Sequence, residues 1–160
     1  MVKLIELLSP ASVIAEMQAR TRDQALAELV AVLPADLGLE AEPLVVLLRE
    51  REEQSPTAIK DGIAVPHGRV PGLTRMVMCF GRSRAGLEFG APDRQSTRFF
   101  FLLFAPAANT GGHLKALARI ARLSRNPALR EKLLAAGDGQ SLFQALAEAD
   151  RQLSQAEVPP

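Results

Sequence analysis

Residues 99–105 form the longest unbroken apolar run of the chain, and this run constrains the fold more than any other feature. The six residues from Phe99 to Phe104 are all phenylalanine or leucine. A strand with large apolar side chains on both faces is stable only when both faces are covered. The run is also much shorter than the roughly 20 residues that a membrane-spanning helix needs. The sequence therefore predicts a buried strand over 97–105, in a sheet that has helices on both sides.

Periodicity and chain-breaking residues predict the other elements around this strand. Thr21 and Gln24 have the spacing of a helix capping box, and Pro34 ends the apolar pattern that follows. We expect helices at 21–33, 43–51, 109–125, 127–136 and 140–149. We expect strands at 62–66, 76–81 and 97–105, and either a short strand or an ordered arm at 2–8 that ends at Ser9-Pro10. Residues 52–61 are predicted to form a loop, and His67 and Gly68 to begin a turn after Pro66.

The size and composition of the chain fit one globular domain. It has 160 residues, of which 48% are apolar and 23% are charged, and chains of this kind form a single core. The net charge of +1 argues against a nucleic-acid-binding surface. Residues 1–18 lack the pattern of a signal peptide, and no apolar stretch is long enough to enter a membrane. We therefore expect a cytoplasmic protein without membrane insertion.

Charge is distributed unevenly along the chain. Residues 1–66 contain 6 Lys or Arg and 11 Asp or Glu, whereas residues 67–160 contain 13 and 7. Arginines on the exposed surface of helices would account for the basic half. Attraction of an anion or an acidic partner would also account for it, and the sequence leaves both interpretations open.

Two histidines and one arginine are the candidates for chemistry. His67 follows a short apolar strand, so its imidazole is presented at a strand end. His113 lies in the first turn of the third expected helix, at the edge of its apolar stripe. Arg51 lies seven residues after Leu44 and continues the apolar face of the second helix, so its guanidinium is directed over the rim of the core.

These residue types suit phosphate chemistry if the fold brings them together. A neutral imidazole is a nucleophile at neutral pH. The free N–H groups of a helix N-terminus near Gly112 would favour a phosphoryl group and lower the pKa of His113. Arg51 would add a planar, permanent cation. Spacing alone does not establish that the three meet, so a structural role for each histidine is the alternative.

Other chemistries have less support. Two histidines without a third ligand make a poor zinc site, so no metal is expected. The sequence has neither glycine-rich nucleotide-binding motif and no serine nucleophile elbow, so no cofactor is expected. The adjacent carboxylates Glu52 and Glu53 are interpreted as a solvated loop face rather than an acid/base pair.

The segment from Arg51 to Arg69 resembles a family signature; its sequence is REEQSPTAIKDGIAVPHGR. It is similar to the enzyme IIA domains of the phosphotransferase system, specifically the fructose/mannitol type, which includes the nitrogen-regulatory IIA proteins. Members have an arginine before a polar loop, and then a Gly-Ile-Ala-Ile-Pro-His-Gly run whose histidine is phosphorylated. Arg51 and residues 62–67 match this pattern without a gap, and His113-Leu114 matches a second histidine that opens a later helix.

The resemblance implies a fold, an activity and roles for residues. The fold would be α/β, with a mixed β-sheet flanked by helices in a single domain of residues 1–155, followed by a frayed tail at 156–160. The protein would be a protein-histidine phosphotransferase that carries a phosphoryl group from phosphoenolpyruvate, through enzyme I and an HPr-type carrier, on His67. Arg51 and His113 would neutralise charge on the phosphoryl group. Its expected binding residues are Gly68, Gly112 and Thr57.

Several partners and roles are compatible with this resemblance. A separate chain favours the regulatory, nitrogen-type IIA proteins, with HPr-type donors and regulatory targets as partners. The alternatives are a sugar-specific component that passes phosphate to a IIB domain, and a IIA-like module that binds partners without phosphotransfer. The sequence leaves a homodimer open.

The signature departs from the family pattern within its polar loop. The family commonly has Ser-Thr-Gly-Ile-Gly-Asn-Gly where residues 56–62 of this chain are PTAIKDG, so Ala58 and Lys60 replace glycines. If these positions require a positive φ, alanine and lysine would be strained and the loop would take another shape. This difference is the main support for a module without phosphotransfer.

Overall fold

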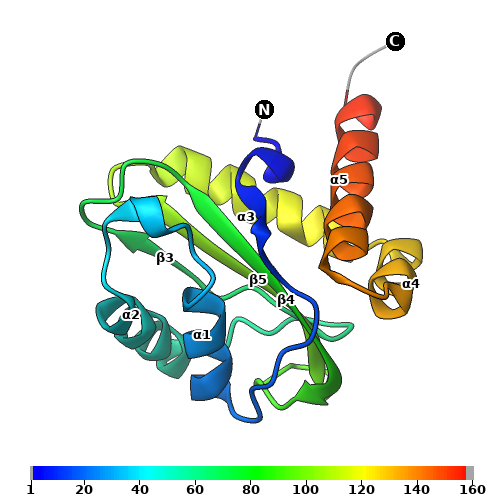
Figure 1. The fold of residues 1–160 in the computed structure, drawn as a ribbon, viewed down its shortest axis with the longest axis horizontal. Helices are drawn as coiled ribbons and strands as arrows, with labels where there is room; N and C mark the ends of the chain where they lie inside the picture. Colours follow the sequence, from blue (N-terminus) through cyan, green and yellow to red (C-terminus); the bar gives the residue numbers. More distant parts are fainter. Residues whose placement is uncertain (1, 158–160) are drawn as a thin grey trace.

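The computed structural model describes residues 2–157, which form a five-stranded sheet with helices on both faces (Figure 1). The strands are β1 (Leu8–Ile14), β2 (Ile63–Ala64), β3 (His67–Val70), β4 (Val77–Leu87) and β5 (Thr97–Pro106). The helices are α1 (Arg22–Val30), α2 (Ala41–Gln54), α3 (Thr110–Ser124), α4 (Pro127–Ala135) and α5 (Gly139–Ala156), with 3-10 helices η1 (Leu4–Glu6) and η2 (Ala35–Leu37). The predicted α/β class, with a mixed sheet flanked by helices, is confirmed.

β5 has two covered faces, as its phenylalanine run predicts. It pairs antiparallel with β4 on one side and parallel with β2 and β3 on the other. Even-numbered side chains from 100 to 104 pack in the core beneath α1 and α2. Odd-numbered side chains from 99 to 103 pack in the core beneath α3, α4 and α5. One strand therefore supplies two separate cores, because successive side chains of a strand point to opposite faces.

His67 begins the strand β3, and the predicted turn at this position is wrong. Pro66 lacks an N–H group and interrupts the ladder after Ala64. Its carbonyl still accepts the N–H of Leu103 at 3.0 Å. Pairing resumes at once, with His67 opposite Leu103. β2 and β3 are therefore successive parts of the same sheet edge, and the proline removes only one donor from it.

The first strand also differs from the prediction, which ended it at Ser9-Pro10. β1 begins only at Leu8, after the 3-10 helix η1, and runs through both residues to Ile14, and it pairs with β4 at one edge of the sheet. Its register shifts between Leu8 and Val13. Pro10 lies inside this irregular stretch, where the missing N–H interrupts no regular ladder.

The helix starts agree better with the sequence than the helix ends do. The Thr21 hydroxyl accepts the N–H of Gln24 at 3.2 Å at the start of α1, as the capping box predicts. α2 extends to Gln54, so the first residues of the predicted loop are helical, and α5 extends past 149 to Ala156. The rest of the expected tail, residues 158–160, lies outside the described residues. No helix within residues 2–157 is long and apolar enough to cross a membrane.

Candidate active site

His67 is half-buried at the first position of β3. Its Nδ1 lies 2.6 Å from the carbonyl oxygen of Val65. A carbonyl oxygen can only accept a hydrogen bond, so Nδ1 carries a proton and donates it. The lone pair of the neutral ring is therefore on Nε2, which is the nitrogen left free to react.

The surroundings favour the neutral form of both histidines. Burial lowers the pKa of His67 below its usual value of 6.5, the Val65 acceptor raises it, Arg51 lowers it and Glu52 raises it. Burial also lowers the pKa of His113, and the nearby His67 and Arg69 lower it further. Both imidazoles are therefore neutral at neutral pH, which is the form in which histidine is a nucleophile.

His113 reaches His67 from the first turn of α3. The two ring centroids lie 5.4 Å apart, with an interplanar angle of 76°, so the rings meet edge to face. His113 is only 7% exposed, and its Nδ1 is buried without a hydrogen-bond partner in residues 2–157. The Asn109 side chain caps this helix by accepting the N–H of Gly112 at 3.0 Å. The fold thus brings together the two histidines that the sequence could only suggest as a pair.

An open cavity of about 480 Å³ borders His67. It is lined by residues from α2, from β3 and from the loop after β5: Leu47, Glu50, Arg51, Gln54, His67, Gly68, Arg69 and Ala107. Arg51 donates from Nη1 to the Ser55 carbonyl at 2.9 Å, and Arg69 donates from Nη1 to the Thr110 hydroxyl at 2.9 Å. Two positively charged groups are therefore held at the edge of the cavity that His67 faces.

The three expected phosphate-binding residues have different surroundings. Gly68 lines the cavity, and a Cβ at this position would overlap the Leu47 side chain, so glycine allows α2 to lie close against β3. Thr57 is buried, and its N–H and hydroxyl both donate to the Glu52 carboxylate. The N–H of Gly112 is engaged by the helix cap. The cavity lining includes Gly68 but neither Thr57 nor Gly112.

Comparison with known proteins identifies the family. Residues 6–149 match the family described as "Phosphoenolpyruvate-dependent sugar phosphotransferase system, EIIA 2". The chain belongs to this EIIA 2 family. The resemblance found in residues 51–69 is confirmed, and the protein is a IIA component of a phosphoryl-transfer system.

Relatives of this EIIA 2 protein include regulatory and sugar-specific members. It is 35% identical to a nitrogen regulatory protein of Bradyrhizobium diazoefficiens, over 90% of this chain and 94% of that protein. It is 34% identical to a fructose-specific EIIA component of Haloferax volcanii, over 63% of this chain and 66% of that protein. The nitrogen regulatory protein IIA-Ntr from Neisseria meningitidis has the same fold, with a TM-score of 0.83 and 26% identity over 89% of this chain and 97% of that chain.

The two replaced glycines of the family signature, at Ala58 and Lys60, do not have a positive φ in this EIIA 2 protein. The positive φ values in the polar loop fall on Asp61 (65°) and Gly62 (75°), and not on Ala58 or Lys60. Aspartate tolerates the left-handed region better than most residues, and the N–H of Asp61 donates to Asp93 at 3.1 Å. Ala58 is buried and forms a β-bridge with Ala64. The strain expected at the two replaced glycines does not occur.

Two charged residues near the site were not predicted. Glu52 is 1% exposed in the last turn of α2, so its interpretation as part of a solvated loop is wrong. Helical phase could have identified it, because Leu44, Leu48 and Glu52 follow one another at intervals of four residues and are all buried. Arg69 lies two residues after His67 in β3 and therefore on the same face of the sheet. Because a turn was predicted at His67, the alternation of side chains along a strand was not applied to Arg69.

The lowered pKa values predict that stability falls on mild acidification. A histidine in the unfolded chain titrates near 6.5, so the unfolded state binds protons at a higher pH than the folded state. The free energy of unfolding should therefore decrease as the pH falls below about 7 and continue to decrease down to the folded-state pKa values. Urea unfolding between pH 7.5 and 5.5 measures this decrease. The double variant His67→Gln, His113→Gln should have a shallower slope, and equal slopes would contradict the lowered pKa values.

Proposed function

We propose that this EIIA 2 protein accepts a phosphoryl group on Nε2 of His67 from a phosphorylated HPr-type protein. The hydrogen bond from Nδ1 to the Val65 carbonyl carries the proposal. This bond fixes the proton on Nδ1, so Nε2 can attack phosphorus without first losing a proton. The half-buried ring borders an open cavity of about 480 Å³, which leaves room for the histidine of a donor protein.

The charges around the cavity support transfer of an anionic group. Phosphoryl transfer needs little covalent chemistry from a protein beyond the nucleophile, and most of the catalysis is positioning and charge stabilisation. Arg51 and Arg69 border the cavity from two different elements, α2 and β3. Each guanidinium makes one hydrogen bond to the protein in residues 2–157, so further donors are available for phosphoryl oxygens. We place His113 beside the ring of His67 as a neutral partner of the same group.

A regulatory role is the more strongly supported of the two family roles. The nitrogen regulatory protein of Bradyrhizobium diazoefficiens aligns over 94% of its length, whereas the fructose-specific component of Haloferax volcanii aligns over 66%. In the regulatory role, the phosphorylation state of His67 would govern contact with target proteins in the cytoplasm. In the sugar-specific role, phosphate would pass on to a IIB domain. Transfer of label from the phosphorylated protein to a fructose IIB domain would favour the sugar-specific role.

Incubation with labelled phosphoenolpyruvate, enzyme I and HPr tests phosphorylation itself. The expected product is a phosphorylated protein whose label is lost in acid and retained in base, as for a phosphohistidine. Absence of label on a folded protein would contradict the proposal. That outcome would favour a module that binds partners without phosphotransfer.

Replacement of either arginine should slow phosphorylation without preventing it. Arg51→Gln or Arg69→Gln removes a cation from the cavity edge, and loss of one charge-stabilising group should reduce the transfer rate by roughly tenfold or more. Single-turnover transfer from phosphorylated HPr measures the rate.

Arg98→Gln is the matched control, since Arg98 is an exposed arginine whose Nη1 also donates to one carbonyl, that of Arg84. It lies five positions before Leu103 on β5, roughly 16 Å along the strand from the level of His67. Rates equal to that of the control would remove the arginines from the site.

A further inference from the structure

The carboxylate of Glu52 is buried beside the site without a cation to pair with. It is 1% exposed, and no ion pair of Glu52 occurs within residues 2–157. Its hydrogen bonds come from Thr57, whose N–H donates at 3.0 Å and whose hydroxyl donates to the other oxygen. Burial of an unpaired carboxylate is costly for folding. Its position in the last turn of α2 therefore needs an explanation beyond stability.

A chain of hydrogen bonds connects this carboxylate to His67. Thr57 is held by Glu52, and the Thr57 carbonyl accepts the N–H of Val65 at 3.2 Å. The Val65 carbonyl in turn accepts Nδ1–H of His67 at 2.6 Å. The peptide that contains this carbonyl has no N–H group, because the next residue is Pro66. Its orientation therefore depends on how the rest of Val65 is held, and the bond to Thr57 holds it.

We propose that Glu52 is a positioning residue for phosphoryl transfer at His67, acting through Thr57 and Val65. Its carboxylate fixes Thr57, Thr57 fixes Val65, and the Val65 carbonyl keeps the proton on Nδ1 so that Nε2 faces the donor. In carboxylate–histidine pairs, a carboxylate binds the ring nitrogen directly and stabilises the charge that develops on the ring. Here a threonine and one backbone carbonyl lie between the two groups. The inference rests on the proposed role of His67 as phosphoryl acceptor.

The charge of Glu52 matches the charge that develops in this transfer. The bond between phosphorus and the donor histidine nitrogen breaks, and its electron pair stays on that nitrogen. A bond forms between Nε2 of His67 and phosphorus, while the proton on Nδ1 remains in place. The ring of His67 therefore gains positive charge, which the Val65 carbonyl and the negative field of Glu52 stabilise. The direction of the Glu52 effect agrees with this, since its carboxylate raises the pKa of His67 against the stronger effect of burial.

The variant Glu52→Gln tests the proposal before any phosphate is added. Glutamine keeps the size of the side chain but removes the negative charge. Nitrogen-15 NMR of the imidazoles should then give a lower pKa for His67 and a larger fraction of the tautomer protonated on Nε2. The signals can be assigned with a His113→Gln variant, because the chain has only two histidines. Phosphorylation by HPr should be about tenfold slower or more, a range typical for supporting groups of reactive histidines.

Glu53→Gln is the matched control, since Glu53 is an exposed neighbour on the same helix. It should leave the pKa, the tautomer and the transfer rate of His67 unchanged. Thr57→Val removes the hydroxyl that donates to Glu52, so it should shift the His67 signals in the same direction as Glu52→Gln. Thr57→Ser should leave these signals as in the wild type, because serine retains the hydroxyl and the N–H. These two variants test the hydrogen-bond chain from Glu52 to His67 if Glu52→Gln does not fold.

The outcomes separate this inference from the proposed function. An unchanged tautomer, pKa and rate in folded Glu52→Gln or Thr57→Val would overturn the positioning role, while phosphorylation of His67 could still hold. Label that persists in a His67 variant would overturn the phosphoryl acceptor. The NMR measurement would even then report whether Glu52 controls the His67 ring.

Discussion

Replacement of His67 by glutamine should abolish phosphorylation by HPr, which is the largest effect expected for any single substitution in the site. Glutamine is similar in size to histidine and can still donate to the Val65 carbonyl, so the strand β3 should be preserved. It has no nucleophilic nitrogen, since the amide lone pair is delocalised. The measurement is incorporation of label from phosphoenolpyruvate in the presence of enzyme I and HPr. No label should be detected on this variant at times when the wild type is fully labelled.

His113→Gln is the informative companion to this experiment. The His113 ring lies edge to face with His67, with centroids 5.4 Å apart, but only His67 has its proton held on Nδ1 by a backbone carbonyl in residues 2–157. His113→Gln should therefore be labelled more slowly than the wild type, and to the same final extent. If His113→Gln lost the label and His67→Gln kept it, the acceptor would be His113.

The central sheet could be predicted because its signal is local. The apolar run of 99–105 requires cover on both faces wherever the rest of the chain lies, and β5 has that cover. Whether the strands end at Pro10 and Pro66 could not be predicted in the same way. A proline removes one donor, and whether that ends a strand depends on the neighbouring strand. β5 continues past Pro66 and pairs with β3 directly afterwards, which only the tertiary fold determines.

The candidate site was predicted in part for the same reason. Arg51 follows from helical phase, and His67 from its place at a strand end, because both signals are local. Their meeting with His113 depends on how α3 packs against the sheet, which spacing alone does not give. Glu52 was missed because its neighbour Glu53 suggested a solvated pair, although one carboxylate is buried and the other exposed. Two adjacent residues of a helix point about 100° apart and need not share an environment.

A buried ion pair between Arg119 and Asp150 joins α3 to α5. Asp150 of α5 is 2% exposed and accepts Nε of Arg119 at 2.6 Å and the N–H of Ile5 at 3.1 Å. Arg119 is 5% exposed and also donates to the Asp150 carbonyl and to Ser154. These bonds join α3, α5 and the amino-terminal segment, which lie side by side in Figure 1. The helix that carries His113 is therefore anchored through Asp150.

Asp150→Ala should lower the free energy of unfolding by about 3 kcal/mol, the lower end for breaking a buried ion pair, because Arg119 keeps only its ion pair with Glu157 and the Ile5 N–H loses its acceptor. For a chain of this size, each kcal/mol lowers Tm by about 2–4 °C, so thermal and urea unfolding will both register the change.

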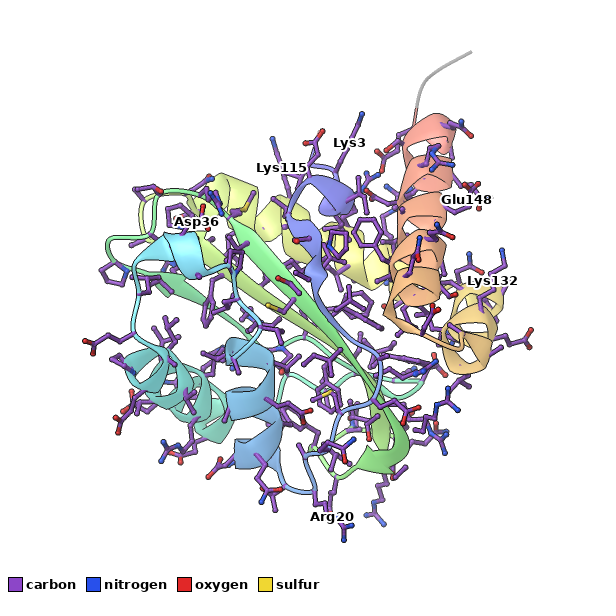
Figure 2. All side chains as sticks on the ribbon, in the orientation of Figure 1. Lys3, Arg20, Asp36, Lys115, Lys132 and Glu148 are labelled. Carbon is purple, nitrogen blue, oxygen red and sulfur yellow. The ribbon has the colours of Figure 1, made fainter. Side chains whose placement is uncertain are left out.

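Glu148→Ala is the control on the same helix, since Glu148 lies on the outward side of α5 (Figure 2) and pairs with exposed Arg151. It should change stability by less than about 1 kcal/mol. Equal effects of the two substitutions would mean that the buried network does not anchor α3. At temperatures where Asp150→Ala is folded, His67 should still accept the label, because the anchor supports the fold and contributes no group to the cavity.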